Sequence, residues 1–133
     1  MPAGAPVAIT FAADGNLWLT ANFFGPGGSR VYRMTAGGVF AAFTVPADST
    51  TNGDSVGAIA AGSDGNIWFT NYDMFSSLES IWRLSRTTGG LTRFKFSESR
   101  EVDGLAGGPD AALWFTTTDN STGQSAIGRM ATT

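Results

Sequence analysis

The sequence predicts an all-β fold built from three similar repeats. Related stretches occur three times, as ADGNLWLTA from Ala13, SDGNIWFTN from Ser63 and PDAALWFTT from Pro109. Three residue types keep one register, with steps of 50 (68 − 18) and 46 (114 − 68) residues: Trp18, Trp68 and Trp114; Asp14, Asp64 and Asp110; Arg33, Arg83 and Arg129. Self-similarity at a period of roughly 20 to 50 residues is typical of solenoids, propellers and arrays.

Composition agrees with short strands rather than helices. The chain has 133 residues, 18 of them glycine, and only 14% are charged, which favours strands joined by tight turns. Its length is that of a single domain, for which roughly 100 to 200 residues is usual. A transmembrane helix is not expected, because there is no run of about 18 apolar residues. The first residues, MPAGAPVA, lack the basic and long apolar regions of a signal peptide.

The second repeat is the most complete and defines the elements. It predicts strands over 57–62, 66–70, 81–84 and 91–96. Asp64-Gly65 is a tight-turn signal between the first two strands, because glycine and Asx residues tolerate positive φ. The last strand alternates apolar and charged residues, as expected for a strand that faces solvent on one side.

The other repeats follow the same plan. The first predicts strands over 9–12, 16–20, 31–34 and 39–45, and the third matches through Ile127-Gly-Arg-Met130 without an outer strand. Four antiparallel strands, repeated radially, are the blades of a β-propeller. We therefore predict one three-blade segment over 1–133, with blade 1 at about 7–45, blade 2 at about 57–96 and blade 3 at about 104–133.

Three blades do not close a ring, and an open apolar blade face favours association. Our preferred hypothesis is a homodimer that closes a six-bladed ring, while a trimer would make nine blades. The alternative is that the chain is a fragment whose remaining blades lie elsewhere.

The repeated residues are expected to be structural. Each tryptophan lies mid-strand among apolar residues, so Trp18, Trp68 and Trp114 should fill the spaces between blades. An arginine follows each turn aspartate after 19 residues (33 − 14, 83 − 64, 129 − 110), at the same edge of the blade. We therefore predict ion pairs of Asp14, Asp64 and Asp110 with Arg33, Arg83 and Arg129, within or between blades.

The blade motif resembles that of the streptogramin B lyase (virginiamycin B lyase) family, a seven-bladed propeller. It reads G-x-D-G-N-x-W-F-T, then I-x-R-[LM], then G-G-x-x-x-F, and it is similar more loosely to NHL-type and gluconolactonase-like propellers. The resemblance implies elimination across an ester linkage in a cyclic peptide antibiotic, with a His general base and Mg²⁺ held by a Glu. This chain has no His, and the position after the motif threonine is Ala21, Asn71 or Thr117 where the family often has Glu.

Several classes of chemistry are excluded by composition. Without cysteine there are no disulfides, thiolate metal sites or thiol nucleophiles, and without histidine the commonest general base and metal ligand are missing. We predict no cofactor and no metal site. The net charge of −3 argues against general affinity for nucleic acid. Nothing in the sequence indicates a compartment.

Function is expected on the long loops, which strand direction places on one face. Eight of the eleven acids fall there: Asp48, Asp54, Asp73, Glu79, Glu98, Glu101, Asp103 and Asp119. This face should attract a small cationic ligand, or it is a solvated acidic rim. The best contact candidates are Asn22, Asn71, Tyr72, Asp73 and Asp119.

Two functions follow from these observations. The first is a self-assembling propeller scaffold or binding module without catalytic chemistry. The second is a degenerate or incomplete enzyme, like a streptogramin lyase or a lactonase, whose catalytic residues lie on absent blades.

Overall fold

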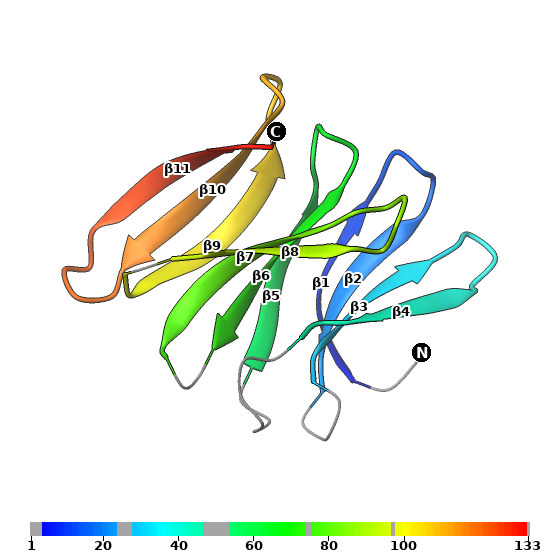
Figure 1. Ribbon diagram of the computed structural model, residues 1–133, viewed down its shortest axis with the longest axis horizontal. Coiled ribbons are helices and arrows are strands. Elements are labelled where there is room, and N and C mark those ends of the chain that lie inside the picture. The colour runs from blue at the N-terminus through cyan, green and yellow to red at the C-terminus, as the bar shows by residue number, and fades with distance from the viewer. Residues whose placement is uncertain (1–3, 24–27, 47–53, 74–75, 97, 133) are drawn as a thin grey trace.

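The computed structural model describes residues 4–23, 28–46, 54–73, 76–96 and 98–132. These residues form eleven strands in three antiparallel sheets and contain no helix. The sheets lie side by side in chain order (Figure 1). The all-β propeller prediction is confirmed.

Each sheet is a meander in which consecutive strands pair. The first contains β1 (Ala5–Phe11), β2 (Leu17–Asn22), β3 (Arg30–Met34) and β4 (Phe40–Thr44). The second contains β5 (Asp54–Ala61), β6 (Ile67–Asp73), β7 (Leu78–Leu84) and β8 (Leu91–Lys95). The third has three strands in the described part of the chain, β9 (Arg100–Gly107), β10 (Ala112–Asp119) and β11 (Ser125–Ala131).

The turn between the first two strands keeps one geometry in all repeats. Gly15 and Gly65 have φ of 80° and 83°, which side-chain-bearing residues seldom adopt. Asp14 and Asp64 accept the backbone N–H two residues later at 3.0 and 3.1 Å. In the third repeat Ala111 takes the glycine position with φ of 57°. The turn therefore persists where its glycine is lost.

The core lies between sheets, because each sheet packs a face on the next. Trp18 joins Ile67, Phe69 and Trp82 in one cluster, and Trp68 joins Leu113 and Phe115 in another. Trp18 and Trp68 are 1% and 0% exposed, whereas Trp114 is 37% exposed. No described sheet follows the third, so the expectation that Trp114 fills an interblade space stays a prediction.

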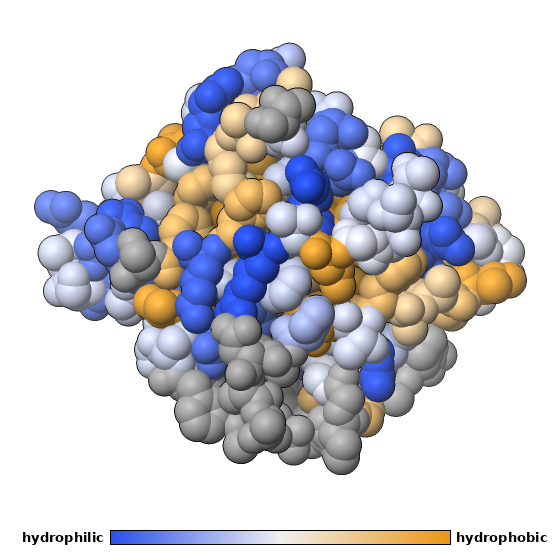
Figure 2. All heavy atoms as spheres, viewed as in Figure 1, coloured by the Kyte–Doolittle hydropathy of each residue, from blue (hydrophilic) through white to orange (hydrophobic). Residues whose placement is uncertain are grey.

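Outside these interfaces, polar and apolar residues mix on the surface. On the side drawn in Figure 2, hydrophobic and hydrophilic residues lie intermingled. In β8, Thr92 and Lys95 are exposed, while Leu91 and Phe94 pack against different core clusters, so the strand does not present one side wholly to solvent. Among the described residues there is no helix long and apolar enough to cross a bilayer.

The repeated aspartates bind the repeated tryptophans. The indole N–H donates to the aspartate of its own turn at 3.2 Å for Trp18, 3.1 Å for Trp68 and 3.0 Å for Trp114. Each arginine lies across from its tryptophan on the neighbouring strand, with the guanidinium carbon 6.0, 5.9 or 5.9 Å from the ring centre. Asp, Trp and Arg thus form one stacked unit, which explains their shared register.

The predicted ion pairs are correct for one repeat only. Arg129 binds Asp110 at 2.7 Å. Hydrogen bonds from Trp114 and Arg129 lower the pKa of Asp110 to about 2. Asp14 instead lies 3.7 Å from Arg86 of the second sheet. In the described part of the chain Asp64 makes no ion pair with Arg83, which donates to Thr92 at 3.4 Å. The indole N–H binds the turn aspartate in all three repeats, and in the third Arg129 binds the same carboxylate as well.

Replacing Asp64 with Ala removes the acceptor for both the Trp68 indole and the Asn66 backbone N–H. We expect the free energy of unfolding to fall by about 1–3 kcal/mol, because a buried donor loses its partner. Asp64→Asn keeps an oxygen acceptor and should cost less. Urea unfolding followed by tryptophan fluorescence measures both. Equal losses for the two variants would contradict this role of the carboxylate.

Candidate functional site

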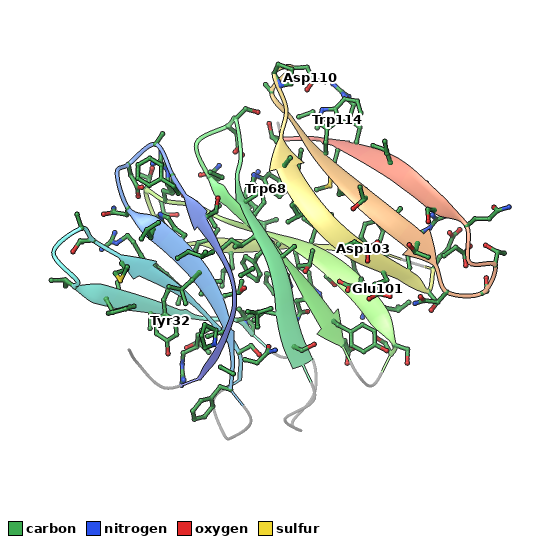
Figure 3. The ribbon with its side chains drawn as sticks, turned by 180° about the vertical axis from the view of Figure 1, so that it is seen from behind. Tyr32, Trp68, Glu101, Asp103, Asp110 and Trp114 are labelled. Atoms are coloured by element: carbon green, nitrogen blue, oxygen red, sulfur yellow. The ribbon has the colours of Figure 1, made fainter. Side chains whose placement is uncertain are left out.

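A cleft opens between the second and third sheets, at the end of the molecule opposite the Asp-Gly turns. One row of side chains crosses the second sheet, since Ser55 pairs with Tyr72 and Tyr72 with Glu79. Glu101 and Asp103 line the cleft from β9, where a β-bulge at Asp103 interrupts the pairing with β10. Figure 3 shows both acids on β9, beside the second sheet.

The cleft has two adjoining parts. The larger, about 340 Å³, is lined by Ser55, Tyr72, Glu79, Arg100, Glu101 and Asn120. The smaller, about 230 Å³, shares four of these residues and adds backbone and side chains of β5 and β9, including Val56, Ala58 and Asp103. The exposed lining of both parts is mainly polar.

Glu79 is the unusual group of the cleft. It is 8% exposed, its carboxylate accepts a hydrogen bond from the Val102 backbone N–H, and its Oε2 is buried without a hydrogen-bond partner. Burial raises the pKa of Glu79 to about 8, against the Val102 hydrogen bond, and the nearby charges of Glu101 and Asp103 add to the rise. At neutral pH this side chain is therefore protonated or in need of a cation.

Three other polar residues around the cleft have partners. Arg100 pairs with Glu98 at 3.0 Å, and Asp103 accepts a hydrogen bond from Thr118 at 3.3 Å. The Asn120 side chain donates to Ser99 at 3.4 Å. Within the described ranges, no three His, Cys, Asp or Glu residues gather in a way that would hold a metal ion.

Of the predicted contact residues, only Tyr72 lines the cleft. Asn22 instead accepts the Val56 backbone N–H at 2.7 Å and so ties the first sheet to the second. Asn71 is buried and accepts from the Trp82 indole at 3.4 Å, and Asp73 accepts from Ser76 at 2.7 Å. Asp119 caps its own turn through Ser121. The five residues are not brought together in one site.

The predicted long loops are shorter than expected, because several strands extend into them. Asp73, Glu79, Glu101, Asp103 and Asp119 lie within strands β6, β7, β9 and β10. Asp54 opens β5, while Asp48 lies outside the described residues. Sequence reasoning counted Glu79, Glu101 and Asp103 as loop acids and did not select them. The available signal was an acid, Glu79, close to the apolar pair Ile81 and Trp82.

The Glu79 carboxyl predicts a pH dependence of stability. Its pKa is near 4.5 when unfolded and about 8 when folded, so the folded state holds a proton that the unfolded chain loses. The free energy of unfolding should therefore fall as pH rises from about 5 to about 8, by up to about 1.4 kcal/mol per pH unit, and level off above.

Urea unfolding at several pH values checks this, with Glu79→Gln as the matched control. Glutamine has the same shape and no proton to lose, so its stability should be flat in that window. The aspartates with lowered pKa, Asp14, Asp110 and Asp119, act only at lower pH. The same decline in both proteins would show that another group is responsible.

Comparison with solved structures gives the same architecture. The model superposes on a streptogramin B lyase structure with a TM-score of 0.67 and 24% sequence identity, covering 100% of this chain and 43% of that one. A candidate gluconolactonase matches with a TM-score of 0.59 and 16% identity, covering 96% of this chain and 48% of that one. The chain thus spans less than half the length of these solved relatives.

Comparisons of sequence give one assignment. No curated protein matches the chain. The model of the Virginiamycin B lyase family matches residues 1–133, the whole of the given sequence. Together with the propeller architecture and the repeated Asp-Trp-Arg unit, this match shows that the chain belongs to the virginiamycin B lyase family.

Proposed function

We propose that this chain is a self-assembling propeller scaffold or binding module, without catalytic chemistry of its own, which closes a six-bladed ring with a second copy. The observation that carries the proposal is that two apolar faces, one at each end of the row of sheets, lack a covering sheet among the described residues.

The first of these end faces belongs to the third sheet. Val31, Ile81 and Ile127 occupy the same repeat position, and they are 0%, 1% and 74% exposed. The first two are covered by the sheet that follows them. On the third sheet Ile127, Trp114 and Thr116 share one side and line an open apolar hollow.

The second end face belongs to the first sheet. Ile9 is 59% exposed, whereas its counterpart Ile59 is 8% exposed beneath the first sheet. Ile9 lies beside Leu19 on the same side of the sheet, and an apolar hollow there also contains Met34 and Phe40. Burying such surface stabilises by about 25 cal/mol per Å².

The two end faces are of the same two kinds as the faces that pack together inside the chain: one carries the tryptophan, and the other is the opposite face of a sheet. A Trp-bearing face lies against the opposite face of the next sheet at both internal interfaces. The third sheet of one copy can therefore cover the first sheet of another, in a head-to-tail contact. Two such contacts related by a twofold axis close a ring.

Catalysis is not part of this proposal. The family resemblance implies a His base and a blade-face Glu, and this chain has no His and carries Ala21, Asn71 and Thr117 at the corresponding positions. One observation favours the second candidate, an incomplete enzyme: the chain covers 43% of the streptogramin B lyase it matches. Catalytic residues would then lie on other blades, and this chain alone should leave streptogramin B intact.

Light scattering on a size-exclusion column, at several concentrations, tests ring closure. We expect a particle of twice the chain's mass. Ile127→Lys and Ile9→Lys, at exposed positions of the two end faces, should each weaken dimerisation by about a hundredfold, because an unpaired charge would be buried. Val39→Lys is the matched control, since Val39 is 67% exposed in a turn outside both faces.

Mixing the two variants sharpens the test. Each keeps one intact face, so Ile127→Lys and Ile9→Lys together should form a weak mixed dimer through a single contact, although each alone is monomeric. A monomeric parent chain, or a dimer unaffected by either substitution, would overturn the proposal and favour completion by other blades. A trimer would replace the six-bladed ring with nine blades.

A further inference from the structure

We propose that the cleft between β7 and β9 binds a primary alkylammonium group, with Glu79 as its main acceptor and Glu101 and Asp103 as supporting charges. The cleft lies within one chain, so this inference goes beyond ring closure and does not depend on it. All three acids line the cleft.

The buried carboxylate is the observation that points to a ligand. Acidic side chains gather on many surfaces without binding anything, but Glu79 is 8% exposed and its Oε2 is buried with no partner. A buried acceptor without a hydrogen bond costs about 1–3 kcal/mol, and more when it is charged. A donor in the cleft removes this cost once the carboxylate turns toward it.

The lining suits an ammonium group better than a metal ion. Within the described residues no three ligating side chains converge, so a divalent cation would lack its usual oxygen ligands. An ammonium group carries three N–H donors and needs fewer side-chain ligands, since Glu79 and one further acid can accept two of them and water the third. The Tyr72 ring lies beside Glu79 on the neighbouring strand and can stack against the cation.

The cleft also has room for the carbon chain of such a ligand. Its smaller part, about 230 Å³, includes Val56, Ala58 and Val102. Val56 and Val102 are almost wholly buried, so the carbon chain of a ligand would pass over a mainly polar lining while its charged end meets Glu79.

The charges that face Glu79 favour a cation. Glu101, Asp103 and Arg100 approach from β9, and Tyr72 from β6. Arg100 is the one base in this lining, and it is paired with Glu98 at 3.0 Å. A proton competes with the ligand for Glu79, so affinity should rise with pH up to about 8 and then level off, while an alkylamine stays charged.

Isothermal titration calorimetry of the whole chain, near pH 8, tests the proposal with two probes. The first is n-butylammonium chloride, and the second is Nα-acetyl-lysine methylamide, with its Nε-acetylated form as the uncharged control. Both carry the same group, and they distinguish a free amine from a lysine side chain. Saturable binding of either, at one per chain, is the expected result, and the acetylated form should not bind.

Variants assign the binding to the cleft. Glu79→Gln should weaken binding by about tenfold, because a charged hydrogen bond is lost. Glu101→Gln, at an exposed position that does not threaten folding, should weaken it by about threefold. Asp14→Asn removes the same charge at the opposite edge, keeps an acceptor for Trp18, and should leave binding unchanged.

The opposite results are equally clear. No saturable binding of either probe, equal losses in Asp14→Asn and Glu79→Gln, or stoichiometric displacement by Mg²⁺ would overturn the proposal. If Glu79→Gln fails to fold, Glu101→Gln and the pH profile decide alone. The mass of the particle is measured separately, so failure of ring closure cannot be mistaken for failure of this site.

Discussion

Burial of one tryptophan-bearing face against the next sheet is the constraint on which the rest of this structure depends. A four-stranded meander has two faces, and a single meander cannot cover either. Trp18 and Trp68 are almost wholly buried in this way. Their indole N–H groups would be unsatisfied there without the turn aspartates, and the arginines cover the remaining ring surface. The repeated Asp-Trp-Arg unit thus fills the space between sheets and also gives the buried indole N–H a hydrogen-bond acceptor.

The same constraint explains the open ends of the row of sheets. The third repeat keeps Trp114 beside Asp110 (Figure 3), and Arg129 binds the same carboxylate, although no described sheet covers them. Its tryptophan is 37% exposed, so the Asp-Trp-Arg unit forms without a covering sheet. The proposed association rests on these open ends, because each end presents the kind of face that the other end requires.

The cleft arises from the offset between the second and third sheets rather than from the repeated motif. The first repeat has no acid at the positions that match Glu79, Glu101 and Asp103. Ser29, just before Arg30 of β3, stands where the second repeat has Glu79. The site is therefore a departure from the repeat. Regular positions build the propeller, and irregular positions at one strand end supply a distinctive surface, as is common on rigid scaffolds.

The sequence by itself determined the strand pattern, the turns and the repeat register, because these follow from local chemistry: alternation, Asp-Gly turns and a fixed spacing of Trp, Asp and Arg. Sequence spacing did not determine which groups pair. Asp14 meets Arg86 of another sheet, and Asp64 serves an indole in place of Arg83. The tertiary structure alone decided that Glu79 is buried, since that depends on how β9 crosses β7. It also separated Tyr72 from Asn22 and Asp119, because packing between sheets, not position along the chain, sets those distances.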